Sequence, residues 1–447
     1  MKKMCLSRNA VCRTLIYRFF VLLLLLIVCL CPLSPERAFA ANQSITRTGD
    51  ILQLVLPGLA VGSTFFAGND AGGWWDREGS KEVALSITTT SAIVLTGKEA
   101  AHKFRPDESD RNSFPSGHTS ASFSGASFIW RRYGWQWGLP AAAAASFVGY
   151  SRFQANQHYA DDILAGASIA VLSNLIWVDR KHDGVSFLPV ALDGGAGFRI
   201  ALTTGGAQDS EMTTPKLDVT DHRYRFNFSF GPAYVAANKV SGGDGTFFDM
   251  YDIEEHNNPL TTAIVHVDAV VGDRHELGLS VWPMESREKG SLPAPITFMG
   301  VTFPGNTPLE SDWRLFDVRL RWRYDLAPSS PFIVKAGAGA MVQYHVIKLE
   351  AKAPARKAEE DDLTMLPFVH ATIGYRLTEG FSFYVDGDGG WLPESRMMEA
   401  GAYLQYTFHP SWNATMGYQY RARDIDQGDV RNKVVQHLPY LAVGYSW

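Results

Sequence analysis

The sequence predicts two domains of different class: an all-α helical bundle, followed by an all-β antiparallel transmembrane barrel of about ten strands. Apolar runs of helical length, rich in small residues, occupy the first half of the chain from Ile51 to about Trp177. After Asp193 the apolar residues recur with period two, the pattern of strands with two different faces. The 447 residues also exceed the length of one ordinary domain.

Residues 1–40 are expected to be a secretory signal peptide. A positively charged start precedes the apolar core VLLLLLIVCLC and the small-residue cleavage site Ala38-Phe39-Ala40, the three parts of such a segment. An uncleaved membrane anchor is the alternative, although the apolar run is short for a bilayer crossing. A lipoprotein is disfavoured because Val28, which is not a small residue, precedes Cys29.

Removal of this segment would change the composition of the chain. All four cysteines lie in it, at positions 5, 12, 29 and 31, so the mature chain would have neither a disulfide nor a thiolate metal site. Six basic residues and one acidic residue would also be lost, which leaves 35 basic against 45 acidic side chains. An acidic chain argues against nucleic acid as a partner, because phosphates attract basic surfaces.

The helical domain is expected to cover residues 41–190. Its apolar runs are ILQLVLPGLAVGSTFFAG, VALSITTTSAIVLTG, LPAAAAASFVGYS and DDILAGASIAVLSNLIWV. Most of them fall short of the roughly 20 apolar residues that cross a bilayer. A compact bundle of small-residue helices is therefore favoured over a set of transmembrane spans. Residues 191–221 are expected to form a linker.

The barrel is expected to cover residues 222–447. In FDVRLRWRYD, for example, apolar side chains alternate with charged ones from Phe316 to Asp325. A soluble sandwich with the same alternation is the alternative. The barrel is favoured because the strands are about 10 to 15 residues long, and because tight turns alternate with longer polar loops at 237–259, 286–311, 349–364 and 424–433. The final YLAVGYSW also resembles the carboxy-terminal strand signal of bacterial outer-membrane proteins, which implies the barrel assembly machinery as a partner.

Ten strands are predicted, at 222–236, 260–272, 274–285, 312–326, 331–348, 365–378, 380–391, 397–409, 411–423 and 434–447. An even number fits a closed antiparallel barrel, and eight or twelve strands would fit as well. Short turns belong on the periplasmic side, so the amino and carboxyl termini of the barrel are both expected there, and the helical domain with them. The aspartates of DGDGG, Asp386 and Asp388, are expected to face the lumen. Lumen charges could pair and plug the barrel or line a pore.

Three short blocks in the helical half carry the candidate chemistry. They supply Lys98 and Arg105 from KEAAHKFRP, Ser116, Gly117 and His118 from FPSGH, and Arg152, His158 and Asp162 from SRFQANQHYADD. In this order and spacing the blocks resemble the type 2 phosphatidic acid phosphatase superfamily, which also contains bacterial class A acid phosphatases and vanadium haloperoxidases. The resemblance covers about residues 45–180 and leaves the barrel outside it.

The chemistry of these residues agrees with the resemblance. A transferring phosphoryl group carries negative charge on three oxygens, which fixed cations and N–H donors stabilise. The forks of Arg105 and Arg152 and the point charge of Lys98 suit such an anion. Ser116, Gly117 and His118 would begin a helix, where free backbone N–H groups favour an anion.

The two histidines are expected to divide the catalytic work. His158 and Asp162 are four residues apart and would share a helix face. Asp162 can then accept from one imidazole nitrogen and leave the other free to attack phosphorus. His118 would protonate the departing oxygen and later activate water. Neither a metal nor a cofactor is expected. Asp161 is expected to be a solvated neighbour, and His102 matches no family position.

The resulting hypothesis is a phosphatase anchored in the outer membrane, with its catalytic domain in the periplasm. A lipid-linked phosphate of lipid A, an isoprenyl lipid or a glycerolipid is favoured, because a bilayer-tethered domain meets lipids first. Hydrolysis of soluble phosphomonoesters by the same site is one alternative. A vanadate-dependent haloperoxidase is disfavoured because nothing separately indicates halide oxidation. The alternative of another class is an outer-membrane channel or adhesin with an idle phosphatase-like domain.

Overall fold

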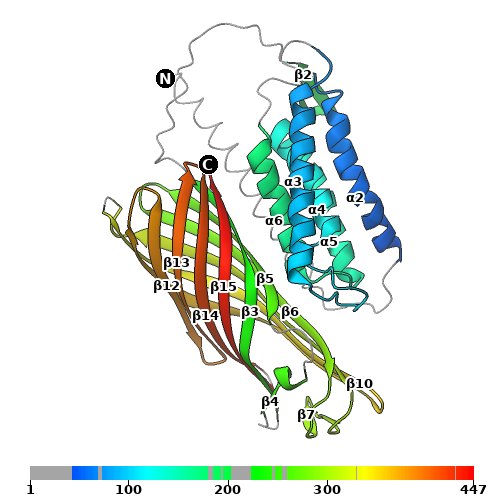
Figure 1. The fold of residues 1–447 in the computed structure, drawn as a ribbon, viewed down its shortest axis with the longest axis vertical. Coiled ribbons are helices and arrows are strands. Elements are labelled where there is room, and N and C mark those ends of the chain that lie inside the picture. The colour runs from blue at the N-terminus through cyan, green and yellow to red at the C-terminus, as the bar shows by residue number, and fades with distance from the viewer. Residues whose placement is uncertain are drawn as a thin grey trace. The chain divides into compact units, whose positions relative to one another are not determined.

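The computed structural model describes residues 43–68, 73–179, 185–192, 195–202, 223–243, 247–253, 259–328, 330–427 and 429–447. The chain divides into two compact units between Asp218 and Val219, and each is described by itself (Figure 1). The predicted signal peptide at 1–40 lies outside the described residues. Strands β1 (Val185–Leu192) and β2 (Gly195–Leu202) pair antiparallel as a two-stranded sheet, where the end of the helical domain and the start of the linker were expected.

The described part of the first unit contains five helices, which confirms the predicted all-α class. They are α2 (Gln43–Thr64), α3 (Arg77–Ala101), α4 (Gly117–Tyr133), α5 (Trp135–Gln154) and α6 (Ala160–Trp177). Helix α3 begins where the Asp76 side chain accepts a hydrogen bond of 3.0 Å from the N–H of Gly79. Helix α4 begins in the same way after Ser116, whose hydroxyl accepts from the N–H of Thr119. Both are side-chain caps that satisfy otherwise unpaired backbone donors.

Small residues allow these helices to approach closely. A Cβ atom at Gly125 on α4 would lie 2.4 Å from the carbonyl oxygen of Leu56 on α2, so only glycine fits there. The buried core of the unit contains apolar side chains from all five helices, among them Leu56, Val83, Phe123, Phe128, Ala145 and Ala170. Among the described helices, α6 alone is long and apolar enough to suit a membrane crossing, and 78% of that window is buried inside the structure. Helix α6 is therefore packed as a core helix.

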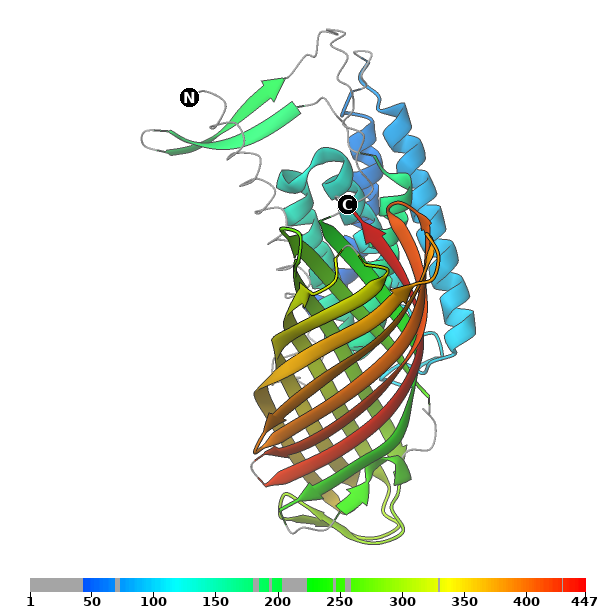
Figure 2. The ribbon, with the colours of Figure 1, turned by 90° about the vertical axis from the view of Figure 1, so that its left-hand side faces the viewer.

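The second unit contains a closed antiparallel barrel of ten strands, as predicted. Its strands are β3 (Tyr224–Gly242), β5 (Leu260–Val271), β6 (His275–Gly290), β9 (Leu309–Asp325), β10 (Phe332–Lys352), β11 (Ala355–Arg376), β12 (Phe381–Leu392), β13 (Ser395–His409), β14 (Trp412–Gln427) and β15 (Val430–Ser446). Strands that follow one another pair with one another, and β15 closes the barrel on β3. Figure 2 shows the strands tilted around the barrel, the geometry that closure requires.

The two faces of the barrel differ as the period-two pattern predicts. Outward side chains are apolar and exposed, among them Leu320, Leu363, Met365, Val369, Ile373, Val385 and Met416. Inward side chains are charged or polar toward the end of the barrel where its first strand begins, at Tyr224, and its last strand ends, at Ser446. They include both predicted lumen aspartates, Asp386 and Asp388. Aromatic pairs such as Phe381–Tyr406, with ring centroids 4.4 Å apart, surround the end where no connection exceeds six residues, here called the short-turn end; the opposite end, called the long-loop end, carries the connections 243–259 and 291–308. An apolar exterior with an aromatic girdle is the surface of a transmembrane barrel.

The polar loops are shorter than predicted, because the strands continue through them. The segment 349–364 is almost entirely strand, with a turn only between Lys352 and Ala355. Its inward side chains, Leu349, Ala351 and Ala358, join the apolar core inside the barrel. Its outward side chains are charged, which made the segment resemble a loop. The segment 424–433 is likewise mostly strand, and the two remaining loops contain β4 (Phe247–Asp249), the 3-10 helix η2 (Met250–Asp252), β7 (Ile296–Phe298) and β8 (Val301–Phe303).

Candidate active site

The first predicted block lies at the end of α3 and in the segment that follows it. Lys98 is in the last turn of α3, and its ammonium donates to the carbonyl of Asn112. His102 caps the helix with a left-handed backbone (φ 45°) and donates its N–H to the carbonyl of Lys98, a structural position consistent with its lack of a predicted role. Arg105 follows in the loop, where its Nε donates to Asp110 Oδ1 at 2.9 Å. The loop folds back on itself, with the N–H of Ser113 donating to the carbonyl of Lys103, and Arg105 lies near enough to Lys98 to act on it electrostatically.

The second block forms the start of α4. The N–H of Ser116 donates to the carbonyl of Asp162 at 2.9 Å, which ties the start of α4 to the start of α6. Gly166 permits this approach, because a Cβ atom there would lie 2.5 Å from the Ser116 carbonyl oxygen. At Gly117 a Cβ atom would meet only Lys98 Cε, at 3.8 Å. The free N–H groups of the first turn of α4 therefore lie beside the Lys98 side chain, which suits an anion.

The third block places His158 against Asp162 at the start of α6. His158 Nδ1 lies 3.6 Å from Asp162 Oδ2, and both side chains are buried. The carboxylate is held by other donors: Ser113 Oγ at 2.5 Å, the N–H of Tyr159 at 2.8 Å and Lys103 Nζ at 2.9 Å. Asp162 is thus fixed in place and presents an acceptor to one nitrogen of the imidazole.

The expectation that Asp161 is solvated is wrong. Its side chain is 2% exposed, and both of its oxygens accept hydrogen bonds from Lys103 Nζ, at 2.8 and 2.9 Å. Lys103 therefore bridges two adjacent buried carboxylates, because Asp162 Oδ1 accepts from the same ammonium group. Sequence reasoning missed Lys103, although two buried acids side by side require a cation nearby.

Asp50 is a second residue that the sequence did not reveal. Its Oδ1 accepts from Arg152 Nη1 at 2.8 Å and lies 3.4 Å from His118 Nε2. Arg152 is nearly fully buried and also donates to Gln157 Oε1 at 2.9 Å and to the carbonyl of Thr46 at 2.8 Å. Asp50 lies on α2, outside every predicted block, so only the fold brings it to the site.

Burial and the surrounding charges set the protonation states of the site. Burial, followed by the positive charge of Arg152, lowers the pKa of His118 from 6.5 to about 4. Burial also lowers the pKa of His158, where Asp162 opposes the shift and Lys98 and Arg105 add to it. Burial acts to raise the pKa of Asp162, but Lys103 and the hydrogen bonds outweigh it and hold that pKa well below its usual range. Near pH 7 both histidines are therefore neutral and Asp162 is ionised.

These contacts bring the three predicted blocks together. The carbonyl of Asp162 connects α6 to Ser116, the side chain of Lys98 lies beside Gly117, and Arg105 and Arg152 both act electrostatically on His118. The arrangement combines an oriented imidazole, a second histidine and three cations in one part of the helical unit. Such a site can bind a phosphate and supply both a nucleophile and an acid. Among the residues that the structure describes, no group of three or more His, Cys, Asp or Glu side chains is placed to hold a metal ion.

Comparison with known proteins identifies the helical unit. Residues 74–183 match the PAP2 superfamily. The chain is 37% identical over 93 residues to the lipid A 1-phosphatase of Porphyromonas gingivalis, a match that covers 20% of this chain and 21% of the relative. It is 31% identical over 160 residues to the lipid A 4'-phosphatase of Helicobacter pylori, covering 33% of this chain and 77% of the relative.

Two solved structures are also similar. Aquifex aeolicus LpxE is 21% identical with a TM-score of 0.27, and the match covers 33% of this chain and 90% of that one. The outer-membrane protease OmpT from Escherichia coli is 8% identical with a TM-score of 0.32, covering 51% of this chain and 97% of that one. The match to the Helicobacter relative, together with the three blocks inside residues 74–183, confirms the predicted resemblance: the chain belongs to the PAP2 superfamily.

Proposed function

We propose that the protein is a metal-independent phosphatase that hydrolyses a lipid-linked phosphate ester through a phosphohistidine. The observation that carries this proposal is the pairing of buried His158 with a fixed carboxylate, Asp162, in a site that also holds Lys98 and Arg105. A neutral imidazole whose Nδ1–H faces a carboxylate has its lone pair on Nε2, the form that attacks phosphorus. Catalytic hydrogen bonds are often long before substrate binds, so the 3.6 Å separation is expected to shorten.

The cations of the site and the start of α4 would bind the phosphate. Lys98, Arg105 and Arg152 would neutralise the oxygens, while the N–H groups after Ser116 and Gly117 donate hydrogen bonds to them. A bound phosphate dianion places negative charge beside His118 and so raises its pKa from the low value. His118 thereby gains the proton that the first chemical step requires.

The reaction would proceed in two displacements. His158 Nε2 forms a bond to phosphorus as the bond between phosphorus and the ester oxygen breaks, and His118 gives its proton to that leaving oxygen. Water then attacks phosphorus, its proton passes to His118, and the phosphorus–nitrogen bond breaks to release inorganic phosphate and neutral His158. Each histidine ends as it began, with the Asp162 carboxylate stabilising the positive charge of His158 in between.

A lipid substrate is supported by the surface of the helical unit. Helix α2 exposes the large apolar side chains Ile51, Leu54, Leu59 and Val61, and Phe66 follows it. Exposed apolar patches of this kind mark membrane or ligand contacts. The names of the two curated relatives add lipid A as a specific candidate for the lipid. Isoprenyl and glycerolipid phosphates share the same reacting group.

We also propose that the catalytic unit works in the periplasm. The barrel begins and ends at the same place, because the N–H of Tyr224 donates to the Trp447 carbonyl at 3.1 Å and the N–H of Trp447 donates back at 3.0 Å. Both residues lie at the short-turn end, whereas the opposite end carries the two long connections, 243–259 and 291–308. Long loops face the outside and short turns the periplasm in outer-membrane barrels, which supports a periplasmic position for this end. The segment that precedes β3 therefore enters the barrel from that side.

Phosphate release by the purified full-length protein tests the function. We expect release of phosphate from lipid A. Phosphatidic acid, an isoprenyl phosphate and p-nitrophenyl phosphate are assayed in parallel as the alternative substrates. Vanadate should inhibit and a chelator should not. The paired substitution Leu54→Ser with Leu59→Ser should reduce hydrolysis of the lipid but not of p-nitrophenyl phosphate. Preference for the soluble ester, unaffected by this variant, would favour the soluble-ester alternative.

A further inference from the structure

The lumen of the barrel is filled at one end and hollow at the other. Toward the long-loop end an apolar cluster occupies the interior, including Phe298, Phe303, Trp313, Ile347 and Leu438, all buried. Below it lies a layer of paired charges, in which Asp317 and Glu399 bind three arginines, Arg319, Arg421 and Arg423. Of the two outcomes that the sequence left open, the lumen charges therefore pair and plug this part of the barrel.

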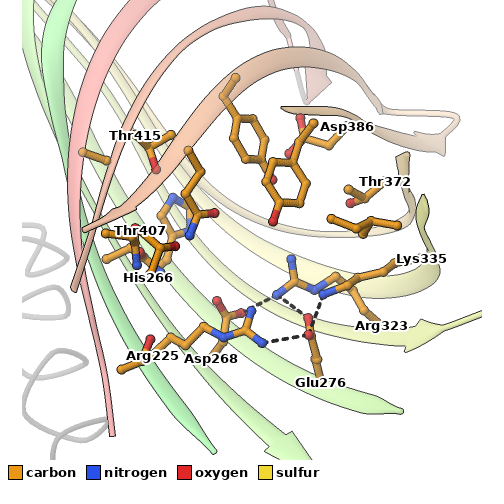
Figure 3. Close-up of a pocket in the computed structure, with 18 of the residues that line it drawn as sticks. Arg225, His266, Asp268, Glu276, Arg323, Lys335, Thr372, Asp386, Thr407 and Thr415 are labelled. Carbon is orange, nitrogen blue, oxygen red and sulfur yellow. Dashed lines mark hydrogen bonds and ion pairs between the residues drawn. The ribbon is translucent and has the colours of Figure 1, made fainter. Parts of the chain in front are cut away.

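The hollow part is a cavity of about 470 Å³ at the short-turn end, here called the cup (Figure 3). Residues of the short turns line its mouth, among them Asp273, Pro328, Pro410 and Ser411. Its volume falls in the range of about 300 to 1,000 Å³ that is usual for small-molecule sites. Because the lumen beyond it is filled, the cup is a dead end rather than part of a pore.

Most cations in the wall of the cup are neutralised. Figure 3 shows Arg225, Arg323 and Lys335 gathered around Glu276, at distances of 3.2, 3.0 and 2.6 Å. Arg323 also pairs with Asp268 at 2.8 Å. In this network of three cations and two carboxylates each cation already has a carboxylate partner, so the contacts stiffen the wall.

Arg321 is different. It lines the cup and its Nε is buried without an acceptor, and within the described part of the chain it forms no hydrogen bond or direct ion pair, although Asp268, Asp386 and Asp388 act on it electrostatically. Asp386 also lines the cup and forms no direct hydrogen bond or ion pair among the described residues, while Arg321 and Arg323 act on it only electrostatically. A charged group in a barrel interior that lacks direct hydrogen-bonding partners is costly, even with opposite charges nearby. A ligand that binds both groups directly would recover part of this cost.

The remaining lining is polar and aromatic. Tyr384 and Tyr403 stack with ring centroids 4.8 Å apart and both line the cup. Tyr440 and Gln405 add further hydrogen-bonding groups. Such a wall offers flat ring faces together with donors and acceptors. It suits a polyhydroxylated ring better than an apolar chain.

We propose that the cup binds a phosphorylated sugar, with the phosphate on Arg321 and sugar hydroxyls on Asp386 and the tyrosines. A guanidinium fork matches a phosphate group, and a carboxylate accepts hydrogen bonds from hydroxyls. The ligand gives both groups a direct hydrogen-bonding partner at once, whereas a neutral sugar brings no anion for Arg321 and inorganic phosphate brings no sugar hydroxyls for Asp386. The site is separate from the proposed phosphatase site and does not depend on that activity.

The test measures binding to the full-length protein by calorimetry in a background of Lys98→Ala with Arg105→Ala, which weakens the phosphate site of the helical unit. Glucose 1-phosphate is the probe, with glucose and inorganic phosphate as the two partial ligands. We expect the sugar phosphate to bind more tightly than either partial ligand. Arg321→Gln and Asp386→Asn should each weaken binding about tenfold or more, the usual effect of removing a charged hydrogen-bond partner.

Controls separate the cup from general charge and folding effects. Arg396→Gln removes the same charge from the outer surface, beside Trp391, and should leave the affinity unchanged. The heat-modifiable migration of the barrel on gels reports folding, and glucose 1-phosphate should raise the unfolding temperature of the background protein but not of its Arg321→Gln derivative. Absence of binding in the background, equal binding by Arg321→Gln, or equal affinity for inorganic phosphate would each overturn the proposal.

Discussion

The carboxylate of Asp50 lies between His118 and Arg152: its Oδ1 is 3.4 Å from His118 Nε2 and 2.8 Å from Arg152 Nη1. It therefore accepts a hydrogen bond from a guanidinium that is proposed to bind phosphate. A bound anion must approach this negative charge, and Asp50 is half exposed, at 47%. In the proposed phosphate site, Asp50 would thus balance the charge of Arg152 at a cost to anion affinity.

Replacing Asp50 by Asn should tighten the binding of vanadate. The change removes one negative charge a few ångströms from the anion, which corresponds to about 1 kcal/mol at the edge of a protein, or about fivefold in the inhibition constant. Inhibition of p-nitrophenyl phosphate hydrolysis measures it. Asp107→Asn is the matched control, because within the described residues the Asp107 side chain accepts hydrogen bonds only from Ser109 in the nearby loop. Weaker vanadate binding by Asp50→Asn would mean that Asp50 orders Arg152 rather than opposing the anion.

The two histidines should be distinguishable by the leaving group of the substrate. His158→Ala should remove activity by several orders of magnitude on every substrate, because binding groups do not replace a nucleophile. His118→Ala should also cause a severe loss of activity on lipid A, whose leaving oxygen needs a proton. The loss should be milder on p-nitrophenyl phosphate, because p-nitrophenolate leaves without a proton. Turnover numbers on both substrates measure this. Equal losses on the two substrates would contradict the acid role of His118.

Substitution of Lys103 should destabilise the helical unit. The buried ammonium holds two buried carboxylates, at 2.8 Å from Asp161 and 2.9 Å from Asp162, and removal of one member of such a cluster costs about 3 to 5 kcal/mol. Lys103→Met should therefore lower the unfolding temperature followed by circular dichroism at the helix band. Adding Asp161→Asn should recover part of the loss, because it removes one of the two stranded charges.

An exposed ion pair provides the comparison for this experiment. Lys81 lies 3.2 Å from Glu78 with both side chains about two-thirds exposed, so Lys81→Met should change stability by less than about 1 kcal/mol. If Lys103→Met and Lys81→Met had the same small effect, the buried cluster would not stabilise the fold. Lys103→Met should also lower turnover, since Asp162 would lose one of the donors that fix it.

Stability should decrease as the pH falls from about 6.5 to about 4, in part because of His118. Its pKa is 6.5 in an unfolded chain and about 4 in the folded one, so over this interval the unfolded state binds the proton and the folded state does not. The stabilising contribution is therefore complete above pH 6.5 and is lost progressively below it. His118→Gln should make the dependence of the unfolding temperature on pH shallower between these limits. An unchanged slope would show that His118 is not held neutral by the fold.

The barrel could be predicted from sequence more completely than the site. Ten strands and the inward position of Asp386 followed from the period-two pattern, because successive side chains of a strand point to opposite faces. The ends of β10 and β11 could not be predicted, since charged, exposed residues such as Lys357 and Glu359 look the same in a strand and in a loop. Cross-strand pairing there depends on a partner strand that the local sequence does not contain.

The motifs of the helical unit were visible, but their surroundings were not. Ser116, His118, His158 and Asp162 lie in short blocks whose order and spacing resemble those of the family. Asp50 and Lys103 reach the same site through the packing of α2 and of the α3–α4 connection, at separations of 102 residues from Arg152 and 58 from Asp161. No local pattern marks such contacts. Asp161 was expected to be solvated, because two adjacent acids repel each other and favour water. In the fold both are buried, because Lys103 binds them both.

Trypsin added to intact cells tests the orientation of the whole protein. If the short-turn end faces the periplasm, the opposite end, with the hairpin of β10 and β11, faces the outside. Lys352, Arg356 and Lys357 lie at that hairpin, and the Lys352 side chain is 77% exposed. Because both strands are paired up to the turn at Lys352 and Ala355, we expect trypsin to nick there slowly or to leave the chain whole, in contrast to the rapid cleavage of a mobile loop.

The helical unit supplies the decisive readout of the same experiment. Lys81, Arg105 and Arg111 are basic sites at surfaces or loops of that unit, so it should be cleaved once the outer membrane is permeabilised and the protease reaches the periplasm. In intact cells these sites should be shielded, and an antibody against the helical unit should detect it at full length or joined to the barrel up to the hairpin. Its loss in intact cells would place the unit on the outside. The proposed hydrolysis of periplasmic substrates would then fail, while the chemistry assigned to His158 and His118 would stand on other grounds.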